Sequence, residues 1–203
     1  GRSAVWGHAL ASLLPFAAVI TENGGVSFLP RAGGFHKLYG VPVSELGYWQ
    51  ERMQAATRQV QREVAGAHLS ADSQYRELDL AIDWNEDRRL SEQAADRVVE
   101  LLLEQGLTAS RSSVHVNYAP PGVDKFRAAS NVAAELFGEW SLDEFVFVGD
   151  SLNDASMFGG FAKSVGVANV QGRWSELSHK PKYLTDAPEG AGFCELATHL
   201  LTL

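Results

Sequence analysis

A short apolar run that ends in acidic residues constrains this chain more than any other feature. Residues 145–148 read Phe-Val-Phe-Val, and residues 149–154 continue Gly-Asp-Ser-Leu-Asn-Asp. An uninterrupted apolar run of this length, closed by a turn residue, is typical of a strand that is buried on both faces. Parallel strands covered by helices have this character, so the sequence predicts a parallel sheet with helices on both sides.

Further strands and helices of the same kind occur at both ends of the chain. Short apolar runs at 17–20, 164–168 and 183–186 also predict buried strands, and helical patterns cover residues 4–14, 125–137 and 189–203. Strands that alternate with helices in this way indicate an α/β fold.

The middle of the chain has a different texture. Residues 76–84 and 113–118 alternate between apolar and polar types, and helices are predicted at 45–66 and 91–105, the latter with Ser91 as N-cap. Alternation predicts strands with one open face. We therefore predict a separate α+β domain at residues 28–118, inserted between core segments 1–27 and 119–203. The Pro- and Gly-containing stretches 29–34 and 119–122 are interpreted as its linkers or as ordinary loops.

Composition excludes several classes of partner. The chain has 17 Lys and Arg against 25 Asp and Glu, a net charge of -8, and no block of five like charges. Nucleic acids and anionic membranes select a clustered basic face, so neither is expected as a partner. No apolar run approaches the ~20 residues of a membrane helix. The single cysteine, Cys194, forbids an internal disulfide and favours a reducing, cytoplasmic location.

The acidic residues after the 145–148 run are candidate metal ligands. Asp150, Asn153 and Asp154 would lie at the carboxyl end of a buried strand, where open α/β sheets bind ligands. Oxygen donors on a rigid strand end suit a Mg2+ ion that keeps several waters and also contacts a phosphate. The alternative is that the two aspartates only cap a turn or the next helix.

The order of motifs along the chain resembles the haloacid dehalogenase-like phosphohydrolase superfamily. Lys125 follows a Gly-Val-Asp turn at the head of a helix and matches the third motif of that family, while residues 149–154 match the fourth. Gly1-Arg2-Ser3 looks like the tail of the second. The likeness is closest to the α/β-capped branch, similar to Cof-type, sucrose-phosphatase and mannosyl-3-phosphoglycerate phosphatase-like proteins. Supporting segments are residues 19–25, 114–117 and 185–192.

This resemblance implies a Rossmann-like core with an α+β cap, a Mg2+ cofactor, and hydrolysis through an aspartyl-phosphate that splits one displacement into two. Developing charge on the phosphoryl group would be stabilised by cations. By motif position the implied roles are catalysis for Lys125, Asp150 and Asp154, metal binding for Asp150 and Asp154, and phosphate binding for Lys125, Asn153, Gly1 and Arg2. In the insertion, Arg76 precedes a predicted strand, and His115 and Asn117 share one polar face of another, so these three are candidate substrate contacts from the cap. A solvated sheet face is the alternative for the cap residues.

The first motif of the family, Asp-x-Asp-Gly with its nucleophile, does not occur in residues 1–203. We expect the natural protein to carry it on a strand and helix before Gly1, and the 203-residue fragment by itself to be inactive. The expected function is a phosphatase of a small phosphorylated metabolite, such as a sugar phosphate. A phosphomutase and a catalytically incomplete phosphate-binding domain are the alternatives.

Overall fold

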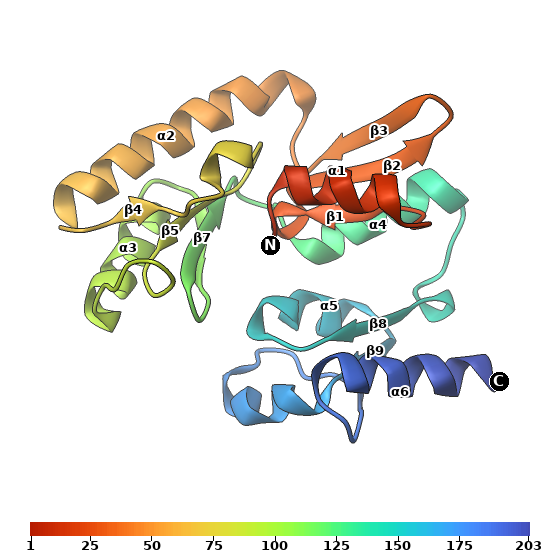
Figure 1. The fold of residues 1–203 in the computed structure, drawn as a ribbon. Coiled ribbons are helices and arrows are strands. Elements are labelled where there is room, and N and C mark those ends of the chain that lie inside the picture. The colour runs from red at the N-terminus through yellow and green to blue at the C-terminus, as the bar shows by residue number, and fades with distance from the viewer. The chain divides into compact units, whose positions relative to one another are not determined.

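The computed structural model describes all residues 1–203, which form two compact units. Unit 1 comprises Gly1–Val132 and unit 2 comprises Ala133–Leu203. The division falls inside helix α4 (Lys125–Phe137), whose head belongs to unit 1. Figure 1 shows the order of the elements along the chain.

The first sheet of unit 1 is an antiparallel sheet in the order β1-β2-β3, covered by one helix. Helix α1 packs on β1 and β2 (Figure 1). The pairing of β1 with β2 ends at Phe28, so the missing N–H of Pro30 disrupts no bond to β1. The bounds are α1 Ala4–Leu13, β1 Val19–Thr21, β2 Val26–Arg31 and β3 Gly34–Tyr39.

The hairpin between β2 and β3 replaces the linker suggested at residues 29–34. Gly33 has φ 85°, a left-handed conformation that glycine adopts without penalty, and it turns the chain back on itself. The expected domain limit at residue 28 lies inside β2. The division into segments 1–27, 28–118 and 119–203 stays a prediction.

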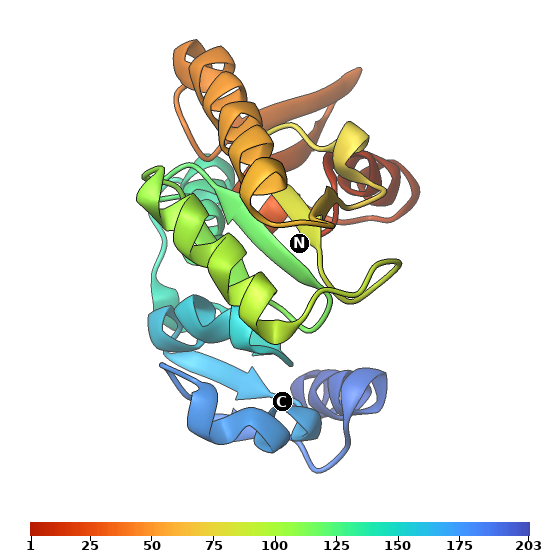
Figure 2. The ribbon, with the colours of Figure 1, turned by 90° about the vertical axis from the view of Figure 1, so that its left-hand side faces the viewer.

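The second sheet of unit 1 is antiparallel in the order β4-β5-β7-β6, with α2 and α3 on the same face (Figure 2). Its core joins the apolar side of the two helices to Ile82, Val116 and Tyr118. Ser91 caps α3 as predicted, because its hydroxyl accepts a hydrogen bond from the N–H of Ala94 (3.1 Å). The bounds are α2 Leu46–Glu63, β4 His68–Leu69, β5 Leu80–Asp83, α3 Glu92–Glu104, β6 Thr108–Arg111 and β7 His115–Ala119.

Unit 2 contains the predicted parallel sheet, in the order β10-β9-β8. Within this unit β8 pairs only with β9, and Val146 is 38% exposed, so β8 is less buried here than its apolar sequence predicts. Phe158, Val170 and Leu177 form the buried cluster. The bounds are β8 Val146–Gly149, α5 Ala155–Gly160, β9 Lys163–Gly166, β10 Tyr183–Leu184 and α6 Glu189–Leu201.

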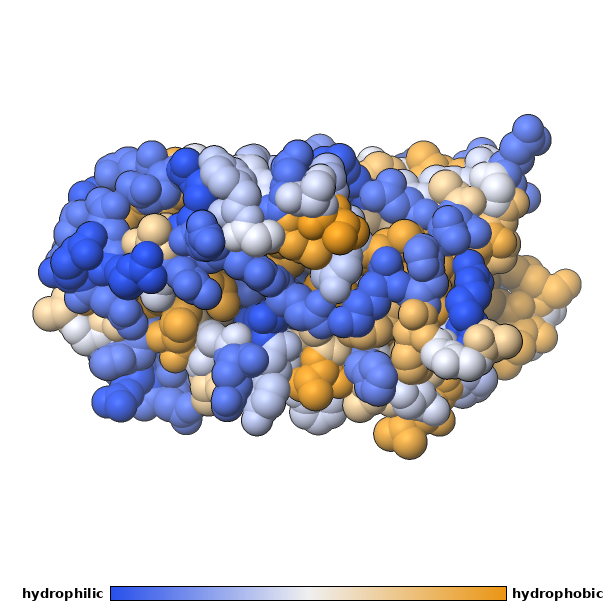
Figure 3. All heavy atoms as spheres, turned by 90° about the horizontal axis from the view of Figure 1, so that it is seen from above, coloured by the Kyte–Doolittle hydropathy of each residue, from blue (hydrophilic) through white to orange (hydrophobic).

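Short 3-10 helices complete the fold. The surface over helix α2 is polar, as its sequence predicts. Seen from above, the surface over α2, at the left of the view, is largely hydrophilic (Figure 3). No helix has the length and apolar character needed to cross a membrane. The 3-10 helices are η1 Glu22–Gly24, η2 Val43–Glu45, η3 Ser73–Tyr75, η4 Leu142–Glu144, η5 Leu152–Asp154 and η6 Ala168–Glu176.

Candidate active site

The acidic turn of unit 2 begins where β8 ends. Gly149 is opposite Gly166 in the parallel register, and its carbonyl accepts a hydrogen bond from the N–H of Val167 (3.0 Å). Asp150 follows directly and is exposed. The structure therefore places its carboxylate at the carboxyl end of parallel strands, the edge where such sheets bind ligands.

Asp154 holds this turn in shape. Its Oδ2 accepts hydrogen bonds from the N–H of Asp150 (3.1 Å), the N–H of Ser151 (3.2 Å) and the hydroxyl of Ser151 (3.0 Å). The side chain is buried, at 7% exposure. The turn-capping alternative drawn from the sequence thus describes Asp154 well, whereas Asp150 makes no such cap.

Gly149 is required by this arrangement. A β-carbon at that position would lie 2.8 Å from Asp154 Oδ2 and 2.9 Å from the ring of Phe147. Both distances are too short for a β-carbon unless the side chains of Asp154 and Phe147 move. The glycine therefore lets Asp154 fold back over the end of the strand.

The carboxylates of this turn could supply some of the oxygen ligands of a hard cation. Neither unit alone contains three or more His, Cys, Asp or Glu side chains that could hold a metal ion. A Mg2+ ion that keeps several waters needs only one or two carboxylates together with a phosphate. The exposed carboxylate of Asp150 fits a direct ligand, and the hydrogen bonds of Asp154 fit a residue that orients it. Asn153, half-buried in the same turn, remains a predicted phosphate contact.

A second polar turn, Glu22–Gly24, lies in unit 1 after β1. Its three residues have φ values of 52°, 52° and 104°. The left-handed region is unfavourable for residues other than glycine, at about 1–2 kcal/mol each, so Glu22 and Asn23 need strong partners to stay there.

The carboxylate of Glu22 has several such partners. Its carboxylate is fully buried and accepts hydrogen bonds from the backbone N–H groups of Ala4 (2.8 Å), Glu77 (2.9 Å), Leu78 (2.7 Å) and Asp79 (3.1 Å). Burial raises the pKa of this carboxyl above its usual value, although the backbone donors oppose the rise. The side chain ties the start of α1 to the segment before β5.

Arg76 and Asp79 make the hydrogen bonds that hold Asn23 and Gly1. The guanidinium of Arg76 donates from Nη1 to Asp79 Oδ1 (2.5 Å) and from Nη2 to the carbonyl of Gly1 (3.0 Å). The amide of Asn23 donates to Asp79 Oδ2 (3.0 Å). Desolvation by burial raises the pKa of Asp79 to about 7, although the charge of Arg76 acts in the opposite direction. We call Gly1, Glu22–Gly24, Arg76 and Asp79 the turn cluster.

The head of α4 packs against the turn cluster. A β-carbon on Gly24 would overlap the carbonyl oxygen of Asp124 and lie 3.1 Å from the backbone nitrogen of Lys125. Asp124 caps α4 by accepting from the N–H groups of Phe126 (2.8 Å) and Arg127 (3.0 Å). Unit 1 therefore brings the backbone at Lys125 beside the turn that holds Gly1.

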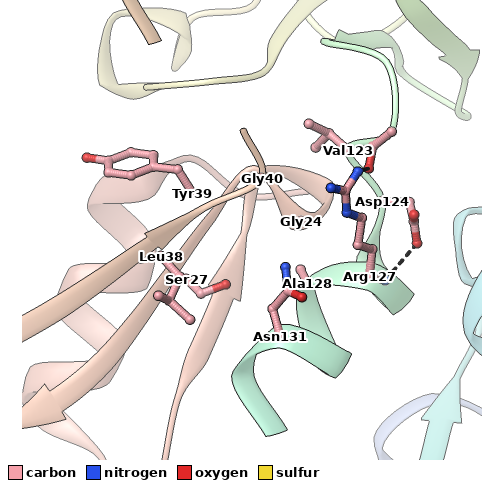
Figure 4. A pocket seen from close by; sticks show the side chains of 11 residues that line it. Gly24, Ser27, Leu38, Tyr39, Gly40, Val123, Asp124, Arg127, Ala128 and Asn131 are labelled. Carbon is pink, nitrogen blue, oxygen red and sulfur yellow. Dashed lines mark hydrogen bonds between the residues drawn. The ribbon is translucent and has the colours of Figure 1, made fainter. Parts of the chain in front are cut away.

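A small cavity lies beside this contact. In Figure 4, Gly24 and Gly40 face Val123 and Asp124 across it, and Asn131 points toward it from α4. Its volume of about 10 Å3 is near the minimum for a single water. A substrate therefore does not fit there.

The remaining predicted residues have the following partners. The carbonyl of Arg2 accepts from the N–H of Glu22 (2.9 Å), and its guanidinium lies 6.0 Å from the centre of the Trp6 ring. His115 Nε2 lies 2.8 Å from a carboxylate oxygen of Glu86. Asn117 is 9% exposed. His115 is of intermediate burial, and Ser110, which is paired with Asn117 in the sheet, is exposed, so this face is partly open.

The predicted residues fall in different units. Gly1, Arg2, Arg76, His115, Asn117 and Lys125 belong to unit 1, and Asp150, Asn153 and Asp154 belong to unit 2. The structure joins Arg76, Gly1 and the backbone at Lys125 through the turn cluster, and it joins Asp150 to Asp154. The meeting of Lys125 with Asp150 stays a prediction.

Sequence reasoning missed the roles of Glu22 and Asp79. A signal was available for both: Glu22 follows the end of an apolar run and begins a turn, and Asp79 lies between Leu78 and Leu80 in a half-buried strand pattern. An acid at such positions needs internal donors. The sequence does not say which donors these are.

Comparison with known proteins identifies the family. The sequence profile of the haloacid dehalogenase-like hydrolases matches residues 50–186, more than half of the chain. The chain belongs to this family, as its motifs predicted, and is a hydrolase.

Its relatives include named phosphatases. A phosphoglycolate phosphatase of Haloarcula marismortui is 31% identical over 181 residues, which cover 87% of this chain and 70% of that protein. Among solved structures, a Thermoplasma acidophilum protein has a TM-score of 0.72 at 20% identity, covering 100% of this chain and 81% of its own. The sucrose-phosphatase of Synechocystis sp. PCC6803, solved with sucrose and phosphate, has a TM-score of 0.71 at 17% identity, with coverages of 98% and 81%. These solved structures support the α/β fold with a cap.

Proposed function

We propose that this protein is a Mg2+-dependent phosphatase of a small phosphorylated metabolite. The observation that carries the proposal is the turn after β8, where Asp154 accepts three hydrogen bonds and leaves the carboxylate of Asp150 exposed at the carboxyl end of the parallel strands. That is the geometry expected of the fourth motif of the family. Family membership supports the reaction class.

Each residue of the proposed site has a chemical task. Asp150 would be the direct ligand of Mg2+, and the bound ion would supply positive charge for the phosphoryl group. Asp154 would orient the turn, and Asn153 with the backbone of Gly1 and Arg2 would contact phosphate. Lys125 would neutralise the phosphate and the attacking carboxylate. The nucleophile would come from an Asp-x-Asp-Gly segment, which does not occur in residues 1–203.

The relatives support the proposed substrate class. One is named for phosphoglycolate and another was solved with sucrose and phosphate, both small and polar. The proposal therefore gives this protein a substrate such as a sugar phosphate or another small phosphate ester, with His115 and Asn117 of the insertion as contacts. Cys194 is exposed and free, which fits a reducing compartment and the proposed cytoplasmic location.

The test is phosphate release by the full natural chain from a panel of small phosphate esters, with and without Mg2+. Replacing Asp150 by Asn should reduce Mg2+-dependent turnover at least about a hundredfold, because a preorganised charge at the phosphoryl group is lost. Asp143→Asn, an exposed carboxylate of the same unit, is the matched control and should keep wild-type turnover. Undiminished turnover in Asp150→Asn would refute the metal assignment.

The same panel separates the two alternatives. A phosphomutase would yield a product that retains its phosphate and would require a bisphosphate activator. A phosphate-binding domain without turnover would be thermally stabilised by Mg2+ and inorganic phosphate while releasing none. Either result would overturn the phosphatase proposal.

A further inference from the structure

Two segments of unit 1 that are distant in sequence meet at the turn cluster. Residues 72–79 belong to the insertion, and the turn Glu22–Gly24 follows β1. Glu22 spans 57 positions to reach Asp79, and Asn23 spans 56. The contact is therefore made by the fold and not by local chain geometry.

Arg76 is the centre of this contact. Its guanidinium bonds Asp72 twice, through Nε (3.0 Å) and Nη2 (2.9 Å), in addition to Asp79 and the carbonyl of Gly1. The side chain is 2% exposed, and that of Asp79 is 1% exposed. With its donors directed to these partners, the guanidinium is part of a closed network and does not extend from the surface.

Charge neutralisation alone does not explain this network. A buried ion pair is weak evidence for stability, because desolvation offsets much of the attraction. The hydrogen bond from Arg76 to the carbonyl of Gly1 neutralises no charge, and one carboxylate oxygen of Asp79 accepts from the neutral amide of Asn23. Both bonds fix the position of polar groups in the turn cluster.

The turn cluster also supports the head of α4, because the two pack against each other. Gly24 has no side chain, and its backbone packs against the carbonyl of Asp124 and the nitrogen of Lys125. Displacement of Asn23 would move Gly24, which is already in a left-handed conformation at φ 104°. The backbone at Lys125 would then lose its support.

We infer that Arg76 and Asp79 are positioning residues for phosphate binding: they hold Gly1 and Asn23 so that the backbone of Gly1–Arg2 and the head of α4 keep one fixed geometry. This inference rests on the proposed function. It assigns Arg76 a role through Gly1 and Asp79, in place of the direct substrate contact that the sequence suggested.

The test compares Asp79→Asn and Arg76→Lys with wild type in the full natural chain. Asn keeps the shape of Asp79, and Lys keeps the charge of Arg76 but not its fork of donors. The control is Asp96→Asn, because Asp96 pairs with Arg111 on the surface at 3.3 Å and 58% exposure. Three quantities are measured: the dissociation constant of inorganic phosphate with Mg2+ by calorimetry, the KM and kcat for p-nitrophenyl phosphate, and Tm.

Both variants should weaken phosphate binding and raise KM about tenfold or more, because small misplacement of binding groups is costly. kcat should change less than KM, and Tm should not fall in Asp79→Asn. Unchanged phosphate binding in both variants, or losses that only follow a fall in Tm, would overturn the inference. Weakening in Arg76→Lys with none in Asp79→Asn would also overturn it and mark Arg76 as a direct contact. Wild-type turnover that disappears in Asp150→Asn shows independently that the proposed function stands.

Discussion

At the scale of single residues, burial of acids governs how this protein responds to pH. Asp79 and Glu22 are both buried, and desolvation raises the pKa of each above its usual value. Asp79 reaches about 7, against 3.8 for an unperturbed aspartate. Between these two pH values the native state holds a proton that the unfolded chain has released. The contribution of Asp79 to the free energy of unfolding should therefore fall as pH rises from about 4 to 7.

Asp79→Asn should remove this dependence. At pH 8 the variant should be more stable than wild type by at least about 1 kcal/mol, or about 2–4 °C in Tm, because the buried charge is absent. Arg76 keeps Asp72 and the carbonyl of Gly1 as partners, so it is not left unpaired. Urea unfolding of both proteins at pH 5 and pH 8 checks this. A variant less stable than wild type at both pH values would show that the ion pair outweighs desolvation.

At the scale of elements, the turn that joins β8 to α5 is built around one close approach. Asp154 folds back over Gly149, and its carboxylate accepts hydrogen bonds from the N–H groups of Asp150 and Ser151. The 3-10 helix η5 is closed by the reciprocal capping of Ser151 and Asp154. The position of Asp150 thus depends on the buried carboxylate of Asp154.

Gly149→Ala should disrupt this turn. The added β-carbon would lie 2.8 Å from Asp154 Oδ2, so the carboxylate must move and its hydrogen bonds weaken. We expect a loss of about 1–3 kcal/mol in stability, typical of overpacking, and faster amide exchange at residues 150 and 151. Gly172→Ala is the matched control, since a β-carbon there meets nothing within 4 Å. Equal exchange rates in the two variants would contradict the role given to Gly149.

At the scale of the whole molecule, the chain divides its core into separate clusters. One cluster joins α2 and α3 to the four-stranded sheet, a second lies under α1, and a third belongs to unit 2. Leu102 is fully buried in the first, and Phe158 is 2% exposed in the third. Contiguous clusters of this kind behave as cooperative units of local unfolding.

Truncating either core should affect its own unit. Leu102→Ala should cost about 2–5 kcal/mol and reduce amide protection in α2, α3, β5 and β7. Phe158→Ala, costing about 3–5 kcal/mol, should do the same for α5, β8 and β9. Hydrogen exchange followed by mass spectrometry distinguishes the regions. Uniform loss of protection along the chain in either variant would indicate a single cooperative core instead.

The sequence by itself determined the elements whose cause is local. Helical periodicity predicted α4 to the residue, Ser91 was identified as a cap, and the apolar run before Gly149 predicted a strand of a parallel sheet. The acidic turn at Asp150 followed from the same stretch. Periodicity and capping act over a few residues, so they can be read in one pass along the chain.

Only the tertiary structure decided which acid has which partner. Glu22 accepts from residues 77–79, Arg76 donates to Gly1, and Asp154, not Asp150, holds the turn after β8. The sequence shows that each of these residues is polar. Its hydrogen-bond partner is whichever polar group the folded chain brings within about 3 Å. The first two sets of partners lie more than 50 positions away in sequence, where only the packing of whole elements sets distances.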